Sequence, residues 1–176
     1  LGDVYKRQLE NGLNPELAAK AGNALQKYVI ENTRLGIPLF LAEEAPHGHM
    51  AIGTTVFPTG IGMAATWSPV LIEEVGNVIA KEIRSQGAHI SYGPVLDLSH
   101  DPRWSRVEET FGEDPVLSGR LGAAMVIGLG SGDLSREYAT IATLKHFLAY
   151  AVPEGGQNGN YASVGTRDLH LSLIHI

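Results

Sequence analysis

The sequence of 176 residues contains no cysteine, which excludes disulfide frameworks and thiolate metal sites and leaves the cellular compartment open. It has no apolar run of about 18 residues, so no membrane-spanning helix is predicted. It also has no basic patch, and a net charge of −6 argues against a phosphate backbone as a partner. We therefore expect neither nucleic acid nor a membrane among the partners.

The composition and the two ends of the chain bound the domain. Hydrophobic residues make up 44% of the sequence and charged residues 18%, which is ordinary for a globular domain with a buried core. Residues 1–8 lack an initiator Met, and residues 171–176 stop on an apolar string without a polar tail. We treat both segments as possible non-native ends and expect residues 9–170 to form part of a domain in a longer protein.

Local signals predict helices. Three dipeptides place a capping side chain directly before a proline suited to the first helical position, namely Asn14-Pro15, Ser68-Pro69 and Asp114-Pro115. Apolar residues then recur at helical spacing in each case. We predict helices over roughly residues 15–35, 69–86 and 115–129.

Short apolar runs alternate with these helices. Ile37–Ala42, Ile90–Leu96 and Thr140–Leu144 are predicted to be buried strands, and charged residues follow each one. Helices of suitable length separate them, so the pattern predicts an α/β fold with parallel β/α crossovers. In α/β barrels and open parallel sheets alike, ligands bind at the carboxyl ends of the strands. The charged residues at those ends are therefore candidates for a binding site.

The stretch Asp101–Pro115 mixes charges of both signs with two aromatic residues, Trp104 and Phe111. Aromatic side chains favour burial, and buried charges need partners, so a folded polar loop is predicted. Such a loop is either a structural network of salt bridges or part of a functional site. Its position after the second predicted strand favours the functional interpretation.

Two histidine-containing motifs follow predicted strands. His47 and His49 have a spacing found among zinc ligands, with Glu44 nearby, although both histidines could instead hydrogen-bond loop carbonyls. Lys145 and His146 follow the third strand and offer ammonium and imidazole donors to a ligand rich in hydroxyl groups. Neither motif is specific by itself.

An arginine and two glutamates lie in the charged loop. Arg106 presents a fixed fork of donors, and Glu109 is an acceptor for them. Pairs of carboxylates can cleave glycosidic bonds. Glu108 and Glu109 are adjacent in sequence, however, so we do not expect both to face one bound sugar.

A series of short motifs together carries a family resemblance. They are EAPHG at Glu44–Gly48, TVFP at Thr55–Pro58, AATW at Ala64–Trp67, GPVLD at Gly93–Asp97, DPRWSR at Asp101–Arg106, ETFGEDP at Glu109–Pro115 and KHF at Lys145–Phe147. In this order they resemble the N-terminal barrel domain of family 3 glycoside hydrolases, the β-glucosidase and β-xylosidase group. The resemblance spans roughly residues 35–169 and implies the first half of a (β/α)8 TIM-type barrel.

The resemblance also implies an activity and a set of site residues. The activity is retaining hydrolysis of terminal non-reducing β-D-glucosyl or xylosyl residues from a β-linked oligosaccharide or glycoside, with no cofactor and no metal. The residues implied to hold the hydroxyls of the sugar are Glu44, Arg106, Lys145 and His146. Glu109, which would orient Arg106 or Lys145, and Asp97 are placed behind them, and His47 is interpreted as a residue that orders its loop.

The chain departs from the family pattern in two places and lacks two of the family's groups. Many members have Asp where Glu44 stands and Gly where Ser105 stands, and the extra methylene of Glu44 changes its reach. The family's nucleophile and acid/base have no matching positions, so we assign no catalytic residue within residues 1–176. The C-terminal part of the same protein is the expected partner that supplies them.

Two other functions stay open at this stage. One is a metal-dependent hydrolase barrel that uses His47, His49, His146 and Lys145. The other is a sugar-binding module without turnover, although half a barrel would expose unpaired strand edges and fold poorly.

Overall fold

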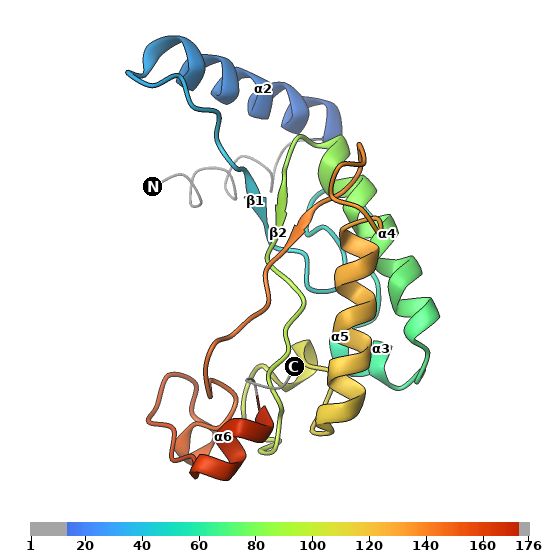
Figure 1. Cartoon of the computed structure of the whole chain (residues 1–176), viewed down its shortest axis with the longest axis vertical. Helices are drawn as coiled ribbons and strands as arrows, with labels where there is room; N and C mark the ends of the chain where they lie inside the picture. Colours follow the sequence, from blue (N-terminus) through green and yellow to red (C-terminus); the bar gives the residue numbers. More distant parts are fainter. Residues whose placement is uncertain (1–13, 173–176) are drawn as a thin grey trace.

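The computed structural model describes residues 14–172, and a parallel sheet lies at its centre (Figure 1). The sheet has the order β1 (Ala42–Glu43), β2 (Ile90–Ser91) and β3 (Ile141–Ala142). Ala42 pairs with Ile90, and Ile90 pairs with Ile141, both in parallel register. The predicted α/β fold with parallel crossovers is confirmed.

The first strand is shorter and more exposed than predicted. Only Ala42–Glu43 pairs with β2, whereas Ile37 and Phe40 are 61% and 71% exposed. The prediction of a buried strand over Ile37–Ala42 is therefore wrong for most of that run. The physical reason is the position of β1 at the edge of the sheet, since within residues 14–172 it has a strand neighbour on one side alone.

The second and third strands are also short, and the third is not buried, since Ile141 and Leu144 are 41% and 56% exposed. The prediction of a buried strand over Thr140–Leu144 is therefore wrong, because β3 is the other edge of the described sheet. The pairing of both strands resumes further along. Proline has no backbone N–H to donate, and Pro94 interrupts the predicted strand Ile90–Leu96 after Ser91. A parallel bridge then joins Val95 to Lys145, and the Leu96 amide donates to the Lys145 carbonyl at 2.7 Å. This bridge keeps the chain after β2 beside the chain after β3, where the charged residues follow.

The three predicted helices are present with the predicted caps. They are α2 (Pro15–Asn32), α4 (Pro69–Ser85) and α5 (Pro115–Leu129). The side chains of Asn14, Ser68 and Asp114 accept hydrogen bonds from backbone amides in the first turns at 2.9, 3.3 and 2.6 Å. Each cap satisfies a donor that the helix itself cannot pair.

Pro58 and the two glycines at 60 and 62 predict a loop over residues 54–62, but a fourth helix, α3 (Gly60–Ala64), begins there. Its first residue explains why glycine stands there. The carbonyl of Glu109 lies so close to Gly60 that a Cβ atom at this position would clash with it. The close approach fixes the charged loop against α3.

Helices α4 and α5 lie side by side along one face of the sheet (Figure 1). They meet at two glycines, where a Cβ on Gly76 would lie 3.0 Å from the Gly128 Cα. The core forms between these helices and the sheet, with fully buried Ile72, Ile79 and Leu121 at its centre. The opposite face of the sheet carries no helix within the described part of the chain.

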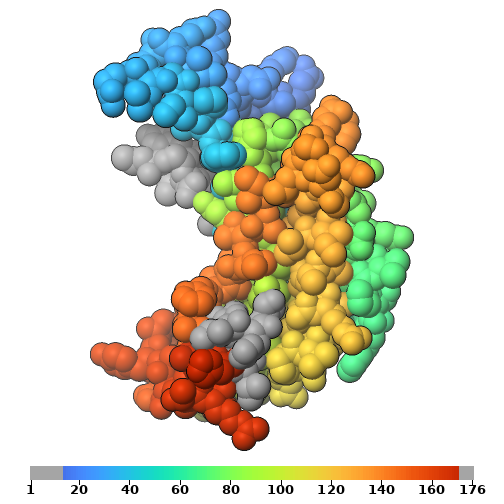
Figure 2. All heavy atoms as spheres, in the orientation of Figure 1, coloured from blue at the N-terminus to red at the C-terminus, as the bar shows by residue number. Residues whose placement is uncertain are grey.

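Figure 2 shows a crescent that is hollowed on the side away from α4 and α5. Helix α2 lies at one tip, with only Ala18 and Gly22 buried, and the last helix, α6 (Thr166–Ser172), lies at the other. Two short 3-10 turns, η1 (Val107–Glu109) and η2 (Glu154–Gly156), belong to loops at the carboxyl ends of the strands. No helix in residues 14–172 combines the length and the apolar character needed to cross a membrane.

The proposed ends of the domain are covered only in part. Residues 1–8 lie outside the described residues, and of residues 171–176 only the first two are described, as the end of α6. The boundaries at 9 and 170 stay a prediction.

Candidate functional site

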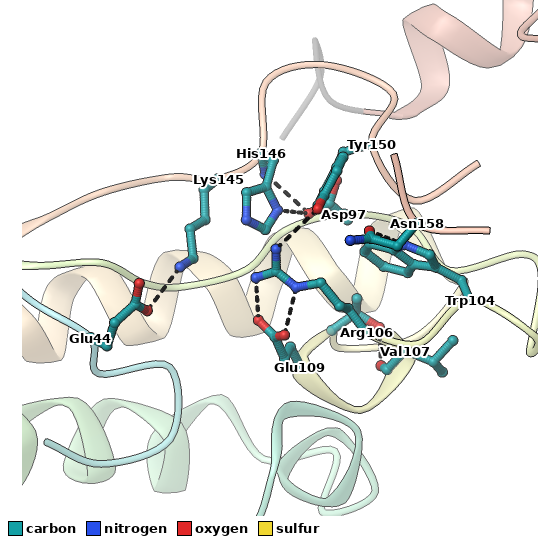
Figure 3. Close-up of polar contacts among 11 residues, drawn as sticks. Glu44, Asp97, Trp104, Arg106, Val107, Glu109, Lys145, His146, Tyr150 and Asn158 are labelled. Atoms are coloured by element: carbon teal, nitrogen blue, oxygen red, sulfur yellow. Dashed lines mark hydrogen bonds and ion pairs between the residues drawn. The ribbon is translucent and has the colours of Figure 1, made fainter. Parts of the chain in front are cut away.

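The ends of all three strands contribute to one polar site (Figure 3). Glu44 directly follows β1, Asp97 follows the extension of β2, and Lys145 and His146 follow β3. The Lys145 Nζ lies 3.1 Å from Glu44 Oε2, and their side chains are 14% and 27% exposed. The parallel register thus brings together residues that follow the two outer strands of the sheet. Their partial exposure leaves both side chains accessible to solvent and to a ligand.

Asp97 fixes the orientation of His146. One carboxylate oxygen of Asp97 accepts from the His146 backbone amide at 3.0 Å and lies 2.6 Å from the imidazole Nδ1. Because a carboxylate accepts, Nδ1 carries the proton, and Nε2 on the opposite edge of the ring is directed away from Asp97. Asp97 is only 1% exposed, so it orients the imidazole from the buried side of the ring.

Arg106 and Glu109 form a two-pronged ion pair across η1. The Arg106 Nε and one terminal nitrogen donate to the two oxygens of Glu109 at 2.6 and 2.7 Å. Burial tends to raise the pKa of Glu109, but hydrogen bonds and charge from Arg106, helped by Lys145 and His146, outweigh burial and hold that pKa below its usual value. The neighbouring Glu108 is exposed, so only one of the two glutamates faces the site, as the sequence indicated.

Each basic side chain of the site is therefore paired with a different carboxylate. Lys145 is paired with Glu44, and Arg106 with Glu109, while the imidazole of His146 is bonded to the buried Asp97. An ammonium has three donors and a guanidinium five, so these pairs leave N–H groups that can reach a ligand. Figure 3 shows the polar end groups of Glu44, Lys145, His146 and Arg106 lying one after another in a row.

The sequence did not point to two further residues of this region, Tyr150 and Asn158. The Tyr150 ring contacts both Arg106 and His146, and the Asn158 side chain accepts from the Trp104 indole N–H at 3.0 Å. The glycines and asparagines of residues 153–160 predict only a loop. The available signal was an aromatic residue close behind Lys145-His146, with glycines that allow the chain to fold back.

His47 and His49 do not form a metal site with a third ligand within residues 14–172. His47 Nδ1 donates to the Phe57 carbonyl at 3.0 Å, and the Phe57 amide donates back to the His47 carbonyl at 2.9 Å, so His47 orders its loop as expected. His49 is 1% exposed. Among residues 14–172, no three His, Asp or Glu side chains are grouped as metal ligands, so the geometry gives the metal-hydrolase alternative no support.

Comparison with known proteins agrees with this arrangement. Residues 6–173 match the glycosyl hydrolase family 3 N-terminal domain. The chain belongs to glycosyl hydrolase family 3. Its α/β fold is part of the TIM-type barrel domain that the resemblance implied. The match to the solved structure of a β-glucosidase confirms this.

Relatives in family 3 include both glucosidases and xylosidases. The chain is 35% identical to a periplasmic β-glucosidase of Salmonella typhimurium, over 82% of this chain and 18% of that protein. It is 40% identical to a β-xylosidase of Formosa agariphila, over 78% of this chain and 20% of that protein. A β-glucosidase of Listeria innocua, solved with glucose, matches with a TM-score of 0.81 and 36% identity over 86% of this chain and 21% of its own. The chain thus spans about a fifth of the length of these family 3 proteins.

Proposed function

We propose that this chain is the sugar-binding part of a retaining β-glycosidase that releases terminal non-reducing β-D-glucosyl or xylosyl residues. One observation carries the proposal: a carboxylate, two cationic donors and an imidazole converge from the ends of three parallel strands and the loop after β2. Lys145 and Glu44 are 3.1 Å apart, and Arg106 and His146 both contact Tyr150. A pyranose ring presents hydroxyls around its rim, which such a mixed set of donors and acceptors can bind.

Each residue has a distinct part in holding the sugar. Glu44 accepts hydrogen bonds from hydroxyls, while Arg106 and Lys145 donate to them. His146 keeps its Nδ1 proton on the Asp97 side, so Nε2 is the atom that meets a hydroxyl and accepts from it. Bonds in which one partner is charged are shorter and stronger than neutral ones, so they fix the ring against the nucleophile. Glu109 and Asp97 keep these side chains oriented without touching the sugar.

The relatives support glucose and xylose as candidate sugars. Named relatives include a β-glucosidase and a β-xylosidase, and the Listeria enzyme has been solved with glucose and, as a mutant, with laminaribiose. Glu44 is the residue whose length bears on the choice, since a longer acid reaches further toward the sugar.

We place the nucleophile and the acid/base outside residues 14–172. A retaining glycosidase needs two carboxyls about 5–5.5 Å apart on either side of the scissile bond. Glu44, Asp97 and Glu109 are each engaged with a basic group of the site. An engaged carboxylate is suited to orienting a donor and poorly suited to attacking a sugar.

The test compares this chain with a protein of full family length that contains it. We expect the longer protein to hydrolyse aryl β-glucosides or β-xylosides, and the 176-residue chain alone to show no turnover. Turnover by the chain alone would contradict the placement of the catalytic groups. Glucose binding without hydrolysis by the longer protein would favour a sugar-binding module, and a stoichiometric metal required for turnover would favour the metal-hydrolase alternative.

A further inference from the structure

The ring of Tyr150 contacts two of the three basic side chains in the site. The Arg106 Cζ lies 5.4 Å from the ring centroid, and the Tyr150 hydroxyl lies 3.4 Å from a terminal nitrogen of Arg106. The same ring lies 4.7 Å from the imidazole of His146, tilted by 59°. A single aromatic side chain thus contacts both a guanidinium and an imidazole of the site.

Tyr150 is itself held in place from behind. Its ring packs edge-on against Trp104 at 5.5 Å, and Trp104 is 2% exposed. The Trp104 indole donates to Asn158 at 3.0 Å, and Gly156 lies against Arg103, where a Cβ would be only 2.7 Å from the Arg103 side chain. The loop after β3 therefore folds back onto the charged loop, and Tyr150 is the point at which the two loops meet beside the ligand.

We propose that Tyr150 is a positioning residue that sets the spacing between the Arg106 and His146 heads and so the affinity of the site for its sugar. This inference rests on the proposed function, because it takes both heads to bind hydroxyls. A planar ring that packs against both groups attracts the guanidinium to its face and hinders rotation of the imidazole. Without the ring, each head would have to be ordered by the sugar itself, and that ordering would lower the affinity.

The ring carries most of this effect, and the hydroxyl carries little. A hydrogen bond at 3.4 Å is long for a guanidinium donor. We therefore expect Tyr150→Phe to change KM and the inhibition constant of glucose by no more than about two-fold. Tyr150→Leu should raise both about ten-fold, with a smaller change in kcat.

The experiment uses a protein of full family length that carries this chain, with an aryl β-glycoside as substrate and glucose as inhibitor. Tyr161→Leu is the matched control, because Tyr161 lies on the same loop and is 84% exposed. KM and the inhibition constant do not depend on the concentration of active protein, so irreversible loss of material cannot imitate the effect. Assays well below the unfolding transition of each variant exclude a contribution from reversible unfolding. The Tyr150→Phe variant provides a second, more conservative test of the same site.

A double-mutant cycle separates positioning from general structural support. If Tyr150 acts through His146, Tyr150→Leu should cost clearly less in a His146→Ala background than in the unchanged protein. An equal loss in both backgrounds, or a Tyr150→Leu variant that binds glucose as the Tyr161→Leu control does, would overturn the inference while leaving the proposed function intact. A full-length protein that neither hydrolyses the aryl β-glycosides nor binds glucose would overturn both.

Discussion

Lys145 and Glu44 form an ion pair at 3.1 Å although 101 positions separate them in the sequence. They come from the two outer strands of the sheet, and the chain following β2 lies between them. The pair therefore depends on the register of all three strands. It also holds an acceptor and a donor side by side, which is the arrangement that neighbouring sugar hydroxyls require.

Glu44→Gln should weaken sugar binding, because the substitution removes the charge from the acceptor and leaves Lys145 without its carboxylate. Charged hydrogen bonds contribute about 1.5–3 kcal/mol, so kcat/KM of a full-length protein should fall roughly 10- to 100-fold. Glu108→Gln is the control, since Glu108 is exposed beside the site. Equal effects of the two substitutions would contradict the role given to Glu44.

Glu44→Asp tests the length of this side chain. The shorter acid is common in the family, and we expect it to keep the charge but to change the ratio of kcat/KM for aryl β-glucoside over aryl β-xyloside. Measurement of both substrates on the same preparation gives that ratio directly. An unchanged ratio would show that the extra methylene does not bear on sugar choice.

Asp97→Ala should destabilise the protein and disturb the site together. Asp97 is 1% exposed and accepts two hydrogen bonds from His146, so its removal leaves two partly buried donors unpaired. The expected loss is about 1–3 kcal/mol in the free energy of unfolding, measured by urea titration. Asp97→Asn retains an acceptor and should lose less, and Asp168→Asn on exposed α6 should lose almost nothing.

Glu109 should make stability depend on pH in the acid range. Its pKa in the folded protein is held below the ordinary value of 4.5, so the ionised form stabilises the fold. That contribution is complete above the unfolded pKa and is lost as the pH falls through the lower folded pKa. The difference in free energy of unfolding between the unchanged protein and Glu109→Gln should therefore shrink from about pH 7 to about pH 3. A difference that is constant over this range would contradict the assignment.

The contact between α4 and α5 can be tested with a matched pair of glycines. Gly128→Ala should destabilise by about 1–3 kcal/mol, because the new methyl group would clash with the Glu73 carbonyl on α4. Gly119 lies in the same helix with nothing within 4 Å of its missing Cβ. Gly119→Ala should therefore stabilise by about 0.5–1 kcal/mol, since alanine favours the helix. Thermal or urea unfolding of both variants measures the contrast.

The sequence predicted the parts of this structure that depend on local chemistry. The caps at Asn14, Ser68 and Asp114 could be recognised because a capping side chain and the proline after it are neighbours in sequence. The charged residues after each strand could be grouped because parallel strands end at the same edge of a sheet. The roles of Glu44, Arg106, Lys145 and His146 came from the family resemblance and stay a prediction.

What the sequence could not give depends on contacts between distant segments. Tyr150 meets Arg106 across 44 positions, and Asn158 meets Trp104 across 54, through a loop whose path no local pattern specifies. The exposure of Ile37 and Phe40 was missed for a related reason. An apolar run indicates a segment that favours burial, but it does not say whether a neighbour is present to cover it.

The bridge between Val95 and Lys145 has a consequence for how accurately this protein must fold. A slip of that pairing by one residue would put His146 where Lys145 now stands and draw the imidazole away from the acid beneath it. No change in composition would be needed to abolish the proposed recognition of a sugar, only a misalignment of the backbone. The sugar selectivity that we propose and the fidelity of strand alignment would then be a single property of this polypeptide.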